Sequence, residues 1–447
     1  MKLKYKIQLI LASFIFIVSN SFAQNNHPAW CAQSNIYEVN LRQYSTSGSI
    51  KDFEKHLIRL KNMGVEILWF MPITPIGIVG RKMTENELGS YYAVRNYKEV
   101  SAEFGTMADW KAMIKHAHCM GFKVIIDWVT NHTAADNVWI KTHPDFYARD
   151  EKGDIIIPND WTDVRKLNYD NREMKDSMIA AMKFWINETD IDGFRCDEAG
   201  KVPDDFWKEC ISKLRQAKNI FMLAEGEKPE LIADGFDATY TWYVMHEMEH
   251  FYSGKRTLQQ FDSVLNHTIS IFPANAYRMY FTTNHDENSW NGTEFEKYGD
   301  AYKAFAVFSQ TFYQSIPLMY SGQEIPNKKR LKFFVKDTIE WNQGYSMAPF
   351  YKTLLKLRKS NSALAAGASY KRLASSNDAA IFAYQRKNGI HKIAVLLNLS
   401  NQPQKFTIKD VALNGHPLNV FKGVMDKIST AYEFSIEPWG YIVYDYK

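Results

Sequence analysis

Short apolar segments alternate with longer amphipathic segments over most of the chain. The apolar segments are predicted strands, and they span 35–40, 66–70, 123–129, 192–197, 220–225, 235–240, 278–284 and 315–321. Segments with helical periodicity lie between them, for example 50–63, 107–120, 174–188 and 205–217. Eight strand-then-helix units predict an α/β fold, a parallel (β/α)8 TIM barrel with outer helices. An open doubly wound sheet is the alternative, but no glycine-rich loop follows the first strand.

The alternation is interrupted after the third predicted strand. Residues 132–172 lack helical periodicity and are rich in Trp, Asp, Asn and Pro, which predicts a short inserted subdomain. Barrel active sites lie at the carboxyl ends of the strands, so we expect this insertion to form a wall of the site. After a last predicted barrel helix at 349–360, residues 366–447 show short alternating segments typical of antiparallel strands. We therefore predict a catalytic domain at 24–360 and a C-terminal β-sandwich at 366–447.

The first residues have the order of a signal peptide. Three lysines precede an apolar segment at 9–18, and small residues stand at positions 21 and 23. This order predicts that residues 1–23 are removed by cleavage near Ala23 and that the protein is exported, to the periplasm or the medium. The apolar segment is short for a membrane span, and we expect no span in the mature chain. An uncleaved anchor is the alternative.

Charge and composition exclude some partners. The chain has 447 residues and a net charge of +4, from 54 basic and 50 acidic residues that are mixed along the sequence. The sequence has no basic cluster of the kind that would predict a nucleic-acid partner. Aromatic residues make up 15% of the chain. They fill protein cores, but sugar-binding sites also use them, because the faces of pyranose rings are apolar.

Four of the predicted strands end in polar clusters. These clusters contain Asp127 and His132 at the end of the third strand, Arg195 and Asp197 on the fourth, Glu225 at the end of the fifth, and His285 and Asp286 after the seventh. A single carboxylate at a strand end is usually a helix cap or an ion-pair partner. Four clusters at carboxyl ends of barrel strands instead indicate an active site. Because side chains alternate along a strand, Arg195 and Asp197 both point into the barrel mouth.

Asp197, Glu225 and Asp286 supply three carboxylates on one face of the barrel. Glycoside hydrolysis commonly needs two carboxyl groups that flank the bond, about 5–5.5 Å apart in retaining enzymes. Arg195 would keep Asp197 ionised, whereas mutual repulsion should leave one carboxyl protonated as the acid. We assign that proton to Glu225, because it directly follows an apolar strand that would desolvate it. Glu227 is the competing candidate for the acid. A buried ion pair that occupied the carboxyl of Asp197 or Glu225 would leave the mechanism without one of its two groups.

The clusters resemble the four ordered motifs of the α-amylase family, glycoside hydrolase family 13. The resemblance covers nearly the whole mature chain and depends mainly on residues 127–132, 193–197, 225 and 284–286. Three further segments also resemble family members, and these are 37–43, 89–92 with 104–106, and 316–324.

The resemblance implies a role for each residue of the clusters. It implies that Asp197 is the nucleophile, that Glu225 is the acid/base, and that Asp286 stabilises the distorted sugar. It also implies that the substrate-binding residues are Tyr92, Asp127, His132, Arg195 and His285. Tyr92 would stack on the cleaved sugar, and Asp127 would support the site from behind.

The calcium pattern of the family is only partly present. Asn131 matches a calcium ligand of animal and fungal members, but Lys201 and Lys166 stand where those enzymes have other ligands. We therefore expect that no cofactor is required, and calcium at Asn131 is the alternative. Residues 166–168 resemble the neopullulanase version of their motif, which leaves α-1,6 cleavage open.

The sequence therefore predicts a retaining α-glycoside hydrolase that acts on α-1,4-glucans such as starch and maltooligosaccharides. Two enzymatic alternatives stay open, an α-glucan transferase and a neopullulanase-like α-1,4/α-1,6 enzyme. A third alternative is a non-catalytic member of the family that only binds sugar.

Overall fold

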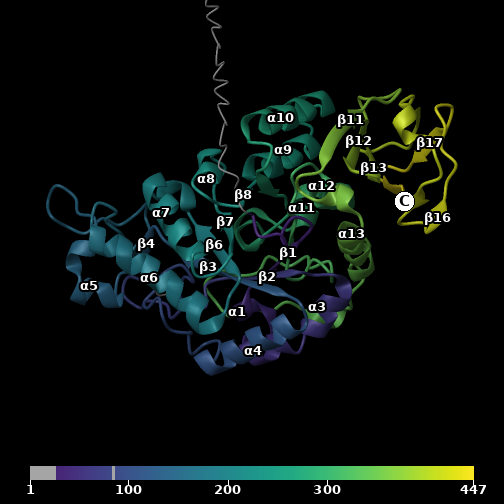
Figure 1. The fold of residues 1–447 in the computed structure, drawn as a ribbon. Helices are drawn as coiled ribbons and strands as arrows, with labels where there is room; N and C mark the ends of the chain where they lie inside the picture. The colour runs from purple at the N-terminus through teal and green to yellow at the C-terminus, as the bar shows by residue number, and fades with distance from the viewer. Residues whose placement is uncertain (1–26, 83–85, 447) are drawn as a thin grey trace, which may run out of the picture.

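The structure is a computed structural model that describes residues 27–82 and 86–446. A large part with outer helices stands beside a smaller, strand-rich part at the carboxyl end of the chain (Figure 1). The predicted signal peptide, residues 1–23, lies outside the described residues. Its cleavage and the export of the protein therefore stay predictions.

The large part is a barrel of eight parallel strands in the order β10-β1-β2-β3-β6-β7-β8-β9. The strands are β1 Ile36–Val39, β2 Ile67–Phe70, β3 Lys123–Val129, β6 Gly193–Asp197, β7 Phe221–Ala224, β8 Ala238–Tyr240, β9 Tyr277–Met279 and β10 Leu318–Tyr320. The ends of this sheet meet, because the amides of Ile316 and Leu318 donate to the carbonyls of Arg278 and Tyr280, each at 2.9 Å. The predicted barrel is confirmed.

The seventh strand is shorter than the sequence pattern predicts. The prediction was 278–284, but β9 ends at Met279. Residues 281–284 leave the ladder, and the helical turns that follow, η3 Glu287–Asn291, begin directly after Asp286. The polar cluster of this strand is therefore carried by an irregular connection at the mouth of the barrel.

Helices surround the strands, as Figure 1 shows. They are α1 Leu41–Tyr44, α2 Ile50–Glu54, α3 Leu57–Met63, α4 Met107–Cys119, α6 Arg172–Thr189, α7 Asp204–Arg215, α8 Glu230–Ala233, α9 Trp242–Tyr252, α10 Leu258–Ile271, α11 Glu294–Tyr298, α12 Tyr302–Thr311 and α13 Ala348–Ser360. Side-chain caps define several starts, and α4 begins with a capping box between Thr106 and Asp109. The helix predicted at 50–63 is divided into α2 and α3.

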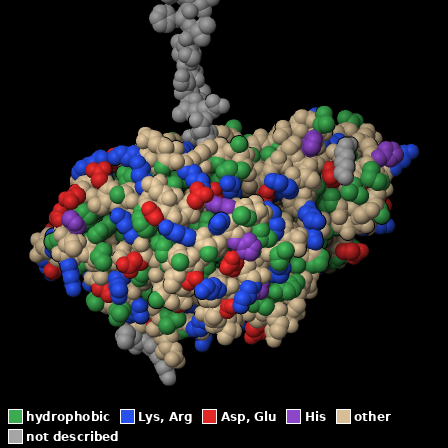
Figure 2. All heavy atoms as spheres, turned by 60° about the horizontal axis from the view of Figure 1, so that its bottom comes forward, with side chains coloured by type: hydrophobic (Ala, Val, Ile, Leu, Met, Phe, Trp, Pro, Cys, Tyr) green, Lys and Arg blue, Asp and Glu red, His purple; other side chains and the backbone are tan. Residues whose placement is uncertain are grey.

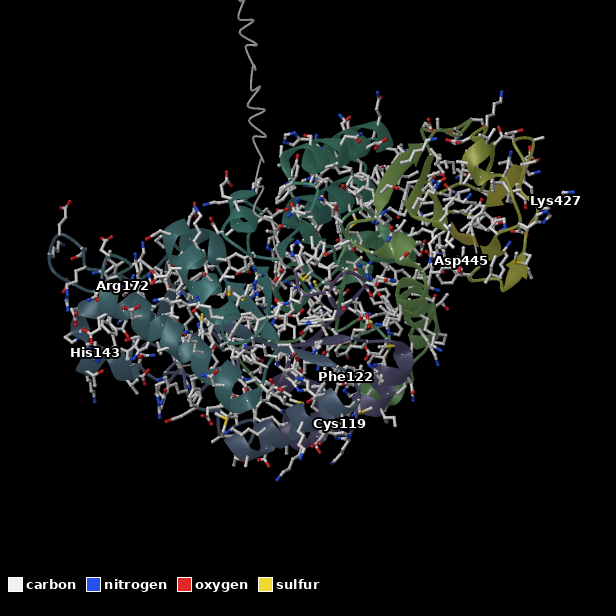
Figure 3. The ribbon with its side chains drawn as sticks, viewed as in Figure 1. Cys119, Phe122, His143, Arg172, Lys427 and Asp445 are labelled. Atoms are coloured by element: carbon white, nitrogen blue, oxygen red, sulfur yellow. The ribbon has the colours of Figure 1, made fainter. Side chains whose placement is uncertain are left out.

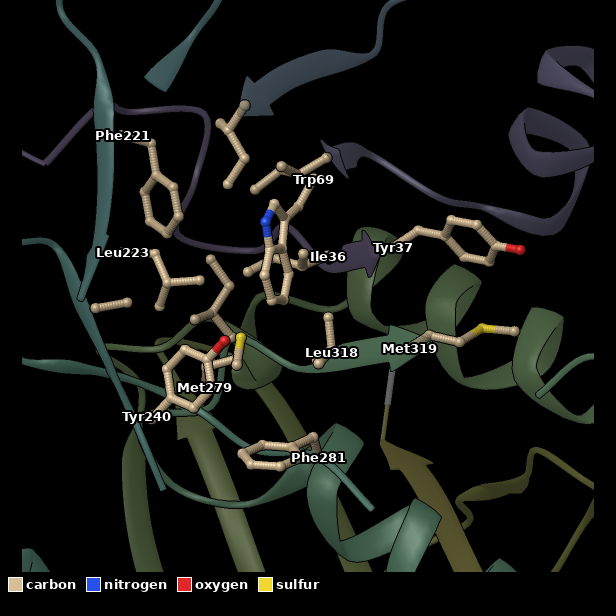
Figure 4. Packing of buried hydrophobic residues seen from close by; sticks show 14 of the residues in the cluster. Ile36, Tyr37, Trp69, Phe221, Leu223, Tyr240, Met279, Phe281, Leu318 and Met319 are labelled. Carbon is tan, nitrogen blue, oxygen red and sulfur yellow. The ribbon is translucent and has the colours of Figure 1, made fainter. Parts of the chain in front are cut away.

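The barrel interior is filled by side chains, as a barrel of eight strands requires. Figure 4 shows Trp69, Leu223 and Met279 converging from different strands, while Tyr37 points away toward the outer helices. Trp69 and Tyr37 are both fully buried. The alternation along each strand thus separates an inner layer, which supports the site, from an outer layer, which packs on helices.

The insertion after β3 forms a short antiparallel pair, β4 His132–Ala134 with β5 Val164–Lys166, and the small helix α5 Val138–Thr142. It packs against the loop that follows β2. The hydroxyl of Thr162 donates to the carbonyl of Gly80 at 2.7 Å. A Cβ at Gly80 would lie 2.3 Å from the oxygen of Thr162, and φ is +80° there, so the approach requires glycine.

The C-terminal part has a six-stranded sheet, β11-β12-β13-β18-β15-β16, and a two-stranded sheet, β14-β17. The strands are β11 Ser369–Leu373, β12 Ile381–Asn388, β13 His391–Asn398, β14 Gln404–Thr407, β15 Leu418–Asn419, β16 Val424–Met425, β17 Glu433–Ile436 and β18 Tyr441–Tyr446. Phe406 and Phe434 from the smaller sheet share a core with Ile442 from the larger one. The antiparallel C-terminal part is confirmed, whereas the limits 24–360 and 366–447 stay predictions.

Hydrogen bonds fasten the two parts to each other. The Tyr384 and Thr311 hydroxyls lie 2.7 Å apart, and Asn361 donates to the Asp445 carboxylate at 2.7 Å. Figure 3 shows Asp445 in the strand-rich part, on the opposite side of the molecule from Arg172 and His143.

The face of the molecule drawn in Figure 2 shows no preference for one sign of charge. On the face drawn in Figure 2, basic and acidic side chains are interspersed among apolar and neutral atoms. Among the helices within residues 27–82 and 86–446, none combines the length and the apolar character that a membrane crossing needs.

Candidate active site

A pocket of about 320 Å³ opens at the carboxyl ends of the barrel strands. It is lined by Arg81, Lys82, Glu87, Gly89, Ser90, Tyr92, His132, Trp161, Thr162, Asp163, Val164, Asp197, Glu198, Glu225, Asp286, Trp290, Phe333 and Phe334. The three carboxylates that the sequence singles out, Asp197, Glu225 and Asp286, all line this pocket. Residues 161–164 show that the insertion forms part of its wall.

Arg195 lies at the centre of the site, fully buried beneath the pocket. Its Nη1 donates to Asp127 Oδ1 at 2.8 Å and to Asp197 Oδ1 at 3.0 Å. Its Nη2 makes an ion contact of 2.7 Å with Glu225 Oε1, without the geometry of a hydrogen bond. Its Nε donates to the Tyr240 hydroxyl at 3.1 Å. One guanidinium therefore holds Asp197 and Glu225 side by side at the floor of one pocket.

Three carboxylates around one cation leave the site with excess negative charge. Burial and the charge of Glu225 raise the pKa of Asp197 well above its usual value, although Arg195 opposes this shift. Burial likewise raises the pKa of Asp127 to about 6. The sequence argument placed the retained proton on Glu225 because of desolvation. Burial does not single out Glu225, because its side chain is 17% exposed and those of Asp197 and Asp127 are only 9% and 0% exposed, so the assignment of the acid to Glu225 stays a prediction.

The ion contact of Glu225 leaves its carboxyl accessible. Its other oxygen, Oε2, accepts a hydrogen bond from the Glu198 amide at 2.7 Å. Arg195 is shared with two further carboxylates, so this contact does not neutralise Glu225, and the side chain still lines the pocket. Glu227 is placed differently. It contacts Arg278 at 3.0 Å and accepts from the Tyr243 amide at the start of α9.

His285 provides a second buried cation below the pocket. Its Nδ1 lies 2.5 Å from Glu38 Oε1, and its Nε2 lies 2.8 Å from the Tyr92 hydroxyl and 3.3 Å from Asp286 Oδ2. Burial lowers the pKa of His285, but the charges of Asp286 and Glu38 and the hydrogen bond to Glu38 outweigh it and raise the pKa to about 9. His285 is therefore positively charged at neutral pH.

Tyr92 connects the two cations. Its hydroxyl donates to Asp127 Oδ2 at 3.1 Å, and its ring stacks on that of His285 with centroids 5.7 Å apart. The ring is partly exposed and lines the pocket. An aromatic face held in this way, close to Asp197, offers a platform for one sugar ring.

The five predicted substrate-binding residues fall into two groups. Tyr92 and His132 line the pocket, whereas Asp127, Arg195 and His285 lie beneath its lining residues. Burial and the charge of Lys201 together lower the pKa of His132 to about 4, so this imidazole is neutral at pH 7. The buried group can act on a substrate through the side chains that it positions.

Sequence reasoning did not single out Glu198, although it directly follows Asp197. Its backbone has φ +45° and ψ +37°, a left-handed conformation that is uncommon for a residue with a side chain. This conformation directs its amide at Glu225. The Glu198 carboxylate contacts the Lys201 ammonium at 2.6 Å and accepts from Asn131 at 3.3 Å.

The side chains near Asn131 do not fit a calcium ion. Calcium requires six to eight oxygen ligands, but the Asn131 amide group donates a hydrogen bond to Glu198, and the Lys201 ammonium contacts the same carboxylate. Lys166 stands opposite His132 in the β4–β5 ladder. Within the part of the chain that the structure describes, no group of three or more His, Cys, Asp or Glu side chains could hold a metal.

Two exposed tryptophans and a phenylalanine were also missed. Trp161 is 37% exposed and Trp290 is 53% exposed, and both line the pocket together with Phe333. Trp290 lies four residues after Asp286, and Trp161 lies in the tryptophan-containing insertion. These places in the sequence were the available signal, but composition alone does not distinguish a pocket wall from a core.

Comparison with known proteins identifies the family. Residues 16–348 match the model of the α-amylase catalytic domain. The chain is 24% identical to Alpha-amylase MalA of Haloarcula japonica, over 84% of this chain and 57% of that protein. It is also 24% identical to Alpha-amylase 2 of Dictyoglomus thermophilum, over 89% of this chain and 74% of that protein. The chain thus spans little more than half the length of the Haloarcula relative.

Solved structures agree with this match over the whole fold. A noncanonic maltogenic α-amylase from Thermotoga neapolitana superposes with a TM-score of 0.84 and 29% identity, over 93% of this chain and 99% of that chain. An α-amylase from Lactobacillus plantarum has a TM-score of 0.82 and 26% identity, over 93% and 99% of the two chains. The matched catalytic domain and the clustered carboxylates together show that this chain belongs to the α-amylase family.

Proposed function

We propose that this protein is a retaining α-glycoside hydrolase that acts on α-1,4-glucans such as starch and maltooligosaccharides. The observation that carries the proposal is that Asp197 and Glu225 contact one guanidinium and line one pocket. Two carboxyl groups in one pocket are what glycoside hydrolysis by double displacement requires. The names of the α-amylase relatives support the same class of substrate.

In the first step, a carboxylate oxygen of Asp197 attacks the anomeric carbon and forms a covalent glycosyl ester. The bond to the leaving oxygen breaks, and Glu225 gives its proton to that oxygen. In the second step, Glu225 takes a proton from water, whose oxygen attacks the same carbon and releases Asp197. Two inversions restore the α configuration, and the proton on Glu225 is regenerated.

The surrounding residues adjust this chemistry. Arg195 holds Asp197 in position, and its charge favours the carboxylate form that attacks, against the opposite effect of burial. Asp286, kept next to the His285 cation, can stabilise positive charge on the sugar ring. The Tyr92 ring can stack on that sugar.

The experiment is hydrolysis of maltoheptaose by the purified protein, followed by NMR of the first product formed. We expect α-anomeric product, and initial release of the β anomer would contradict retention. Asp197→Asn should reduce kcat to less than a thousandth of its value, because the covalent step is lost, and retention of a tenth would reject the nucleophile. Glu227→Gln is the matched control and should keep most of the activity.

A second candidate function is glucan transfer or cleavage of both α-1,4 and α-1,6 bonds. The observation that favours it is the match to a cyclomaltodextrinase from a Bacillus, which is 24% identical over 78% of this chain and 65% of that protein. Products longer than maltotriose after incubation with maltotriose would indicate transfer. Cleavage of pullulan would indicate a broader linkage range. A non-catalytic sugar-binding role would leave all these substrates intact.

We also propose that the protein needs no bound metal and that it is exported. The hydrogen-bonded arrangement of Asn131, Glu198 and Lys201 supports activity without a bound metal. Dialysis against a chelator should then leave the rate on maltoheptaose unchanged, and loss of activity that calcium restores would contradict this. Export with cleavage near Ala23 can be checked by sequencing the N-terminus of the protein recovered from outside the cytoplasm.

A further inference from the structure

The pocket has two aromatic walls on opposite sides of the barrel mouth. The insertion that carries Trp161 follows β3, and the segment that carries Trp290 follows β9. In the closed order of eight strands, β3 and β9 are separated by four positions in either direction. Trp161 and Trp290 therefore reach the same pocket from opposite sides.

The wall that carries Trp161 is continuous with Glu225. The amide of Glu198 donates to Glu225 at 2.7 Å, and the Glu198 carboxylate contacts the Lys201 ammonium at 2.6 Å. That ammonium lies 5.5 Å from the centroid of the Trp161 ring. The centroids of the His132 and Trp161 rings lie 5.6 Å apart. Hydrogen bonds from Thr162 and Arg165 hold this segment in place. We call these residues, 161, 198 and 201, the leaving-group wall.

The wall that carries Trp290 is continuous with Tyr92. The Tyr92 and Phe333 rings are stacked, with centroids 6.3 Å apart and planes 16° apart. The Phe333 ring lies 5.4 Å from that of Trp290 on centroids. The turn η3, which carries Trp290, is fastened to the loop after β10, because Leu331 donates its amide to the Asn288 side chain at 2.8 Å. An aromatic series therefore leads from Tyr92 at the cleavage position to the rim, and we call residues 290 and 333 the glycosyl wall.

We propose that the leaving-group wall binds the sugar that departs and that the glycosyl wall binds the sugars that remain on Asp197. This inference depends on the proposed function, because it assigns Glu225 as the proton donor. The proton must reach the departing oxygen, so the departing sugar lies on the side of Glu225, where Trp161 and Lys201 stand. Trp161 and Trp290 are thus specificity-determining residues for opposite halves of the substrate.

Two substrates separate the halves. Maltopentaose has sugars on both sides of the bond that is cut, whereas α-maltosyl fluoride has a fluoride leaving group, which needs neither a leaving-group sugar nor a proton from Glu225. The measured quantity is the ratio of kcat/KM on maltopentaose to kcat/KM on α-maltosyl fluoride. A variant that is partly unfolded lowers both rates alike and does not change this ratio.

For Trp161→Ala we expect the ratio to fall about tenfold, the effect of losing one aromatic face stacked on a ring. Trp161→Phe keeps such a face and should restore most of the ratio. For Trp290→Ala both rates should fall by a similar factor, so that the ratio stays within about twofold, because one glycosyl wall serves both substrates.

The outcomes separate the inference from the proposed function. If the unaltered protein cleaves neither substrate, the proposed function is wrong. If it cleaves both and Trp161→Ala leaves the ratio unchanged, the proposed function stands and the inference is overturned. A ratio that falls in Trp290→Ala and not in Trp161→Ala would also overturn it, because the two walls would then be reversed.

Discussion

The buried pair between Glu38 and His285 should make the stability of the protein fall at alkaline pH. Both side chains are almost fully buried, at 0% and 1% exposure, and Glu38 lies on β1, inside the barrel. The proposed perturbation is Glu38→Gln, which keeps the shape of the side chain and an oxygen for His285 Nδ1 but removes the charge. Desolvation of His285 is then opposed mainly by Asp286, so the pKa of His285 should fall below its present value of about 9.

The size of the effect follows from proton linkage. The pKa of His285 is raised from 6.5 to about 9, which corresponds to about 3 kcal/mol of stability. Because the pKa of the folded state is the higher one, this stability is fully present below pH 6.5 and is lost as pH rises through 9. In Glu38→Gln the loss over the same interval should be much smaller. The buried amide adds a cost that does not depend on pH.

The assay is urea unfolding of both proteins at several pH values between 6 and 10. The difference in the free energy of unfolding should be largest near pH 6 and should shrink by up to about 3 kcal/mol toward pH 10, because only the charged pair titrates. The alkaline limb of kcat/KM should move to lower pH in the variant. Parallel stability curves together with an unchanged alkaline limb would refute the assignment of a charged His285.

Three other substitutions test the frame around the site. Burial raises the pKa of Asp192, but its histidine and lysine partners and a backbone amide outweigh burial and lower the pKa to about 2. Asp192→Asn should therefore lower the free energy of unfolding, measured with urea at pH 7, by about 2 kcal/mol. This difference from the unaltered protein should vanish as pH falls from 4 through 2, and a difference that stayed constant would contradict the ion pairs. Gly193→Ala places a Cβ 1.9 Å from a carbonyl oxygen of β7 and should lower the free energy of unfolding by about 3 kcal/mol or more. The control is Gly367→Ala, whose added Cβ meets open space and should leave the thermal midpoint unchanged. Gly80→Ala would push against Thr162 and should lower kcat/KM on maltopentaose more than on α-maltosyl fluoride; equal losses would argue against a positioned wall.

Much of the candidate site could be predicted because Asp197 and Glu225 stand at the ends of apolar strands. The positions of Asp197 and Glu225 at the ends of β6 and β7 therefore followed from local pattern and the geometry of a barrel. The choice of Glu225 as the acid does not follow from this strand pattern. It depends on how far each side chain reaches into the pocket, and Glu225 is more exposed than Asp197 although both end apolar segments.

Other features lacked a local signal. The left-handed backbone at Glu198 is stabilised by contacts with distant residues, and an acidic residue in a sequence gives no indication of it. In the C-terminal part, β11 has a weak sequence signal because it alternates between exposed and partly buried positions at the edge of its sheet, and β15 and β16 have only two residues each.

The sharing of one guanidinium among three acids has a consequence for how variants of this protein combine. Once Asp127, Asp197 or Glu225 is neutralised, Arg195 can bind the remaining two more strongly, so losses measured for single substitutions will not sum. The first neutralisation carries most of the damage and the second adds little. The three acids therefore form one cooperative unit, and a replacement at any one of them changes how strongly the other two bind Arg195.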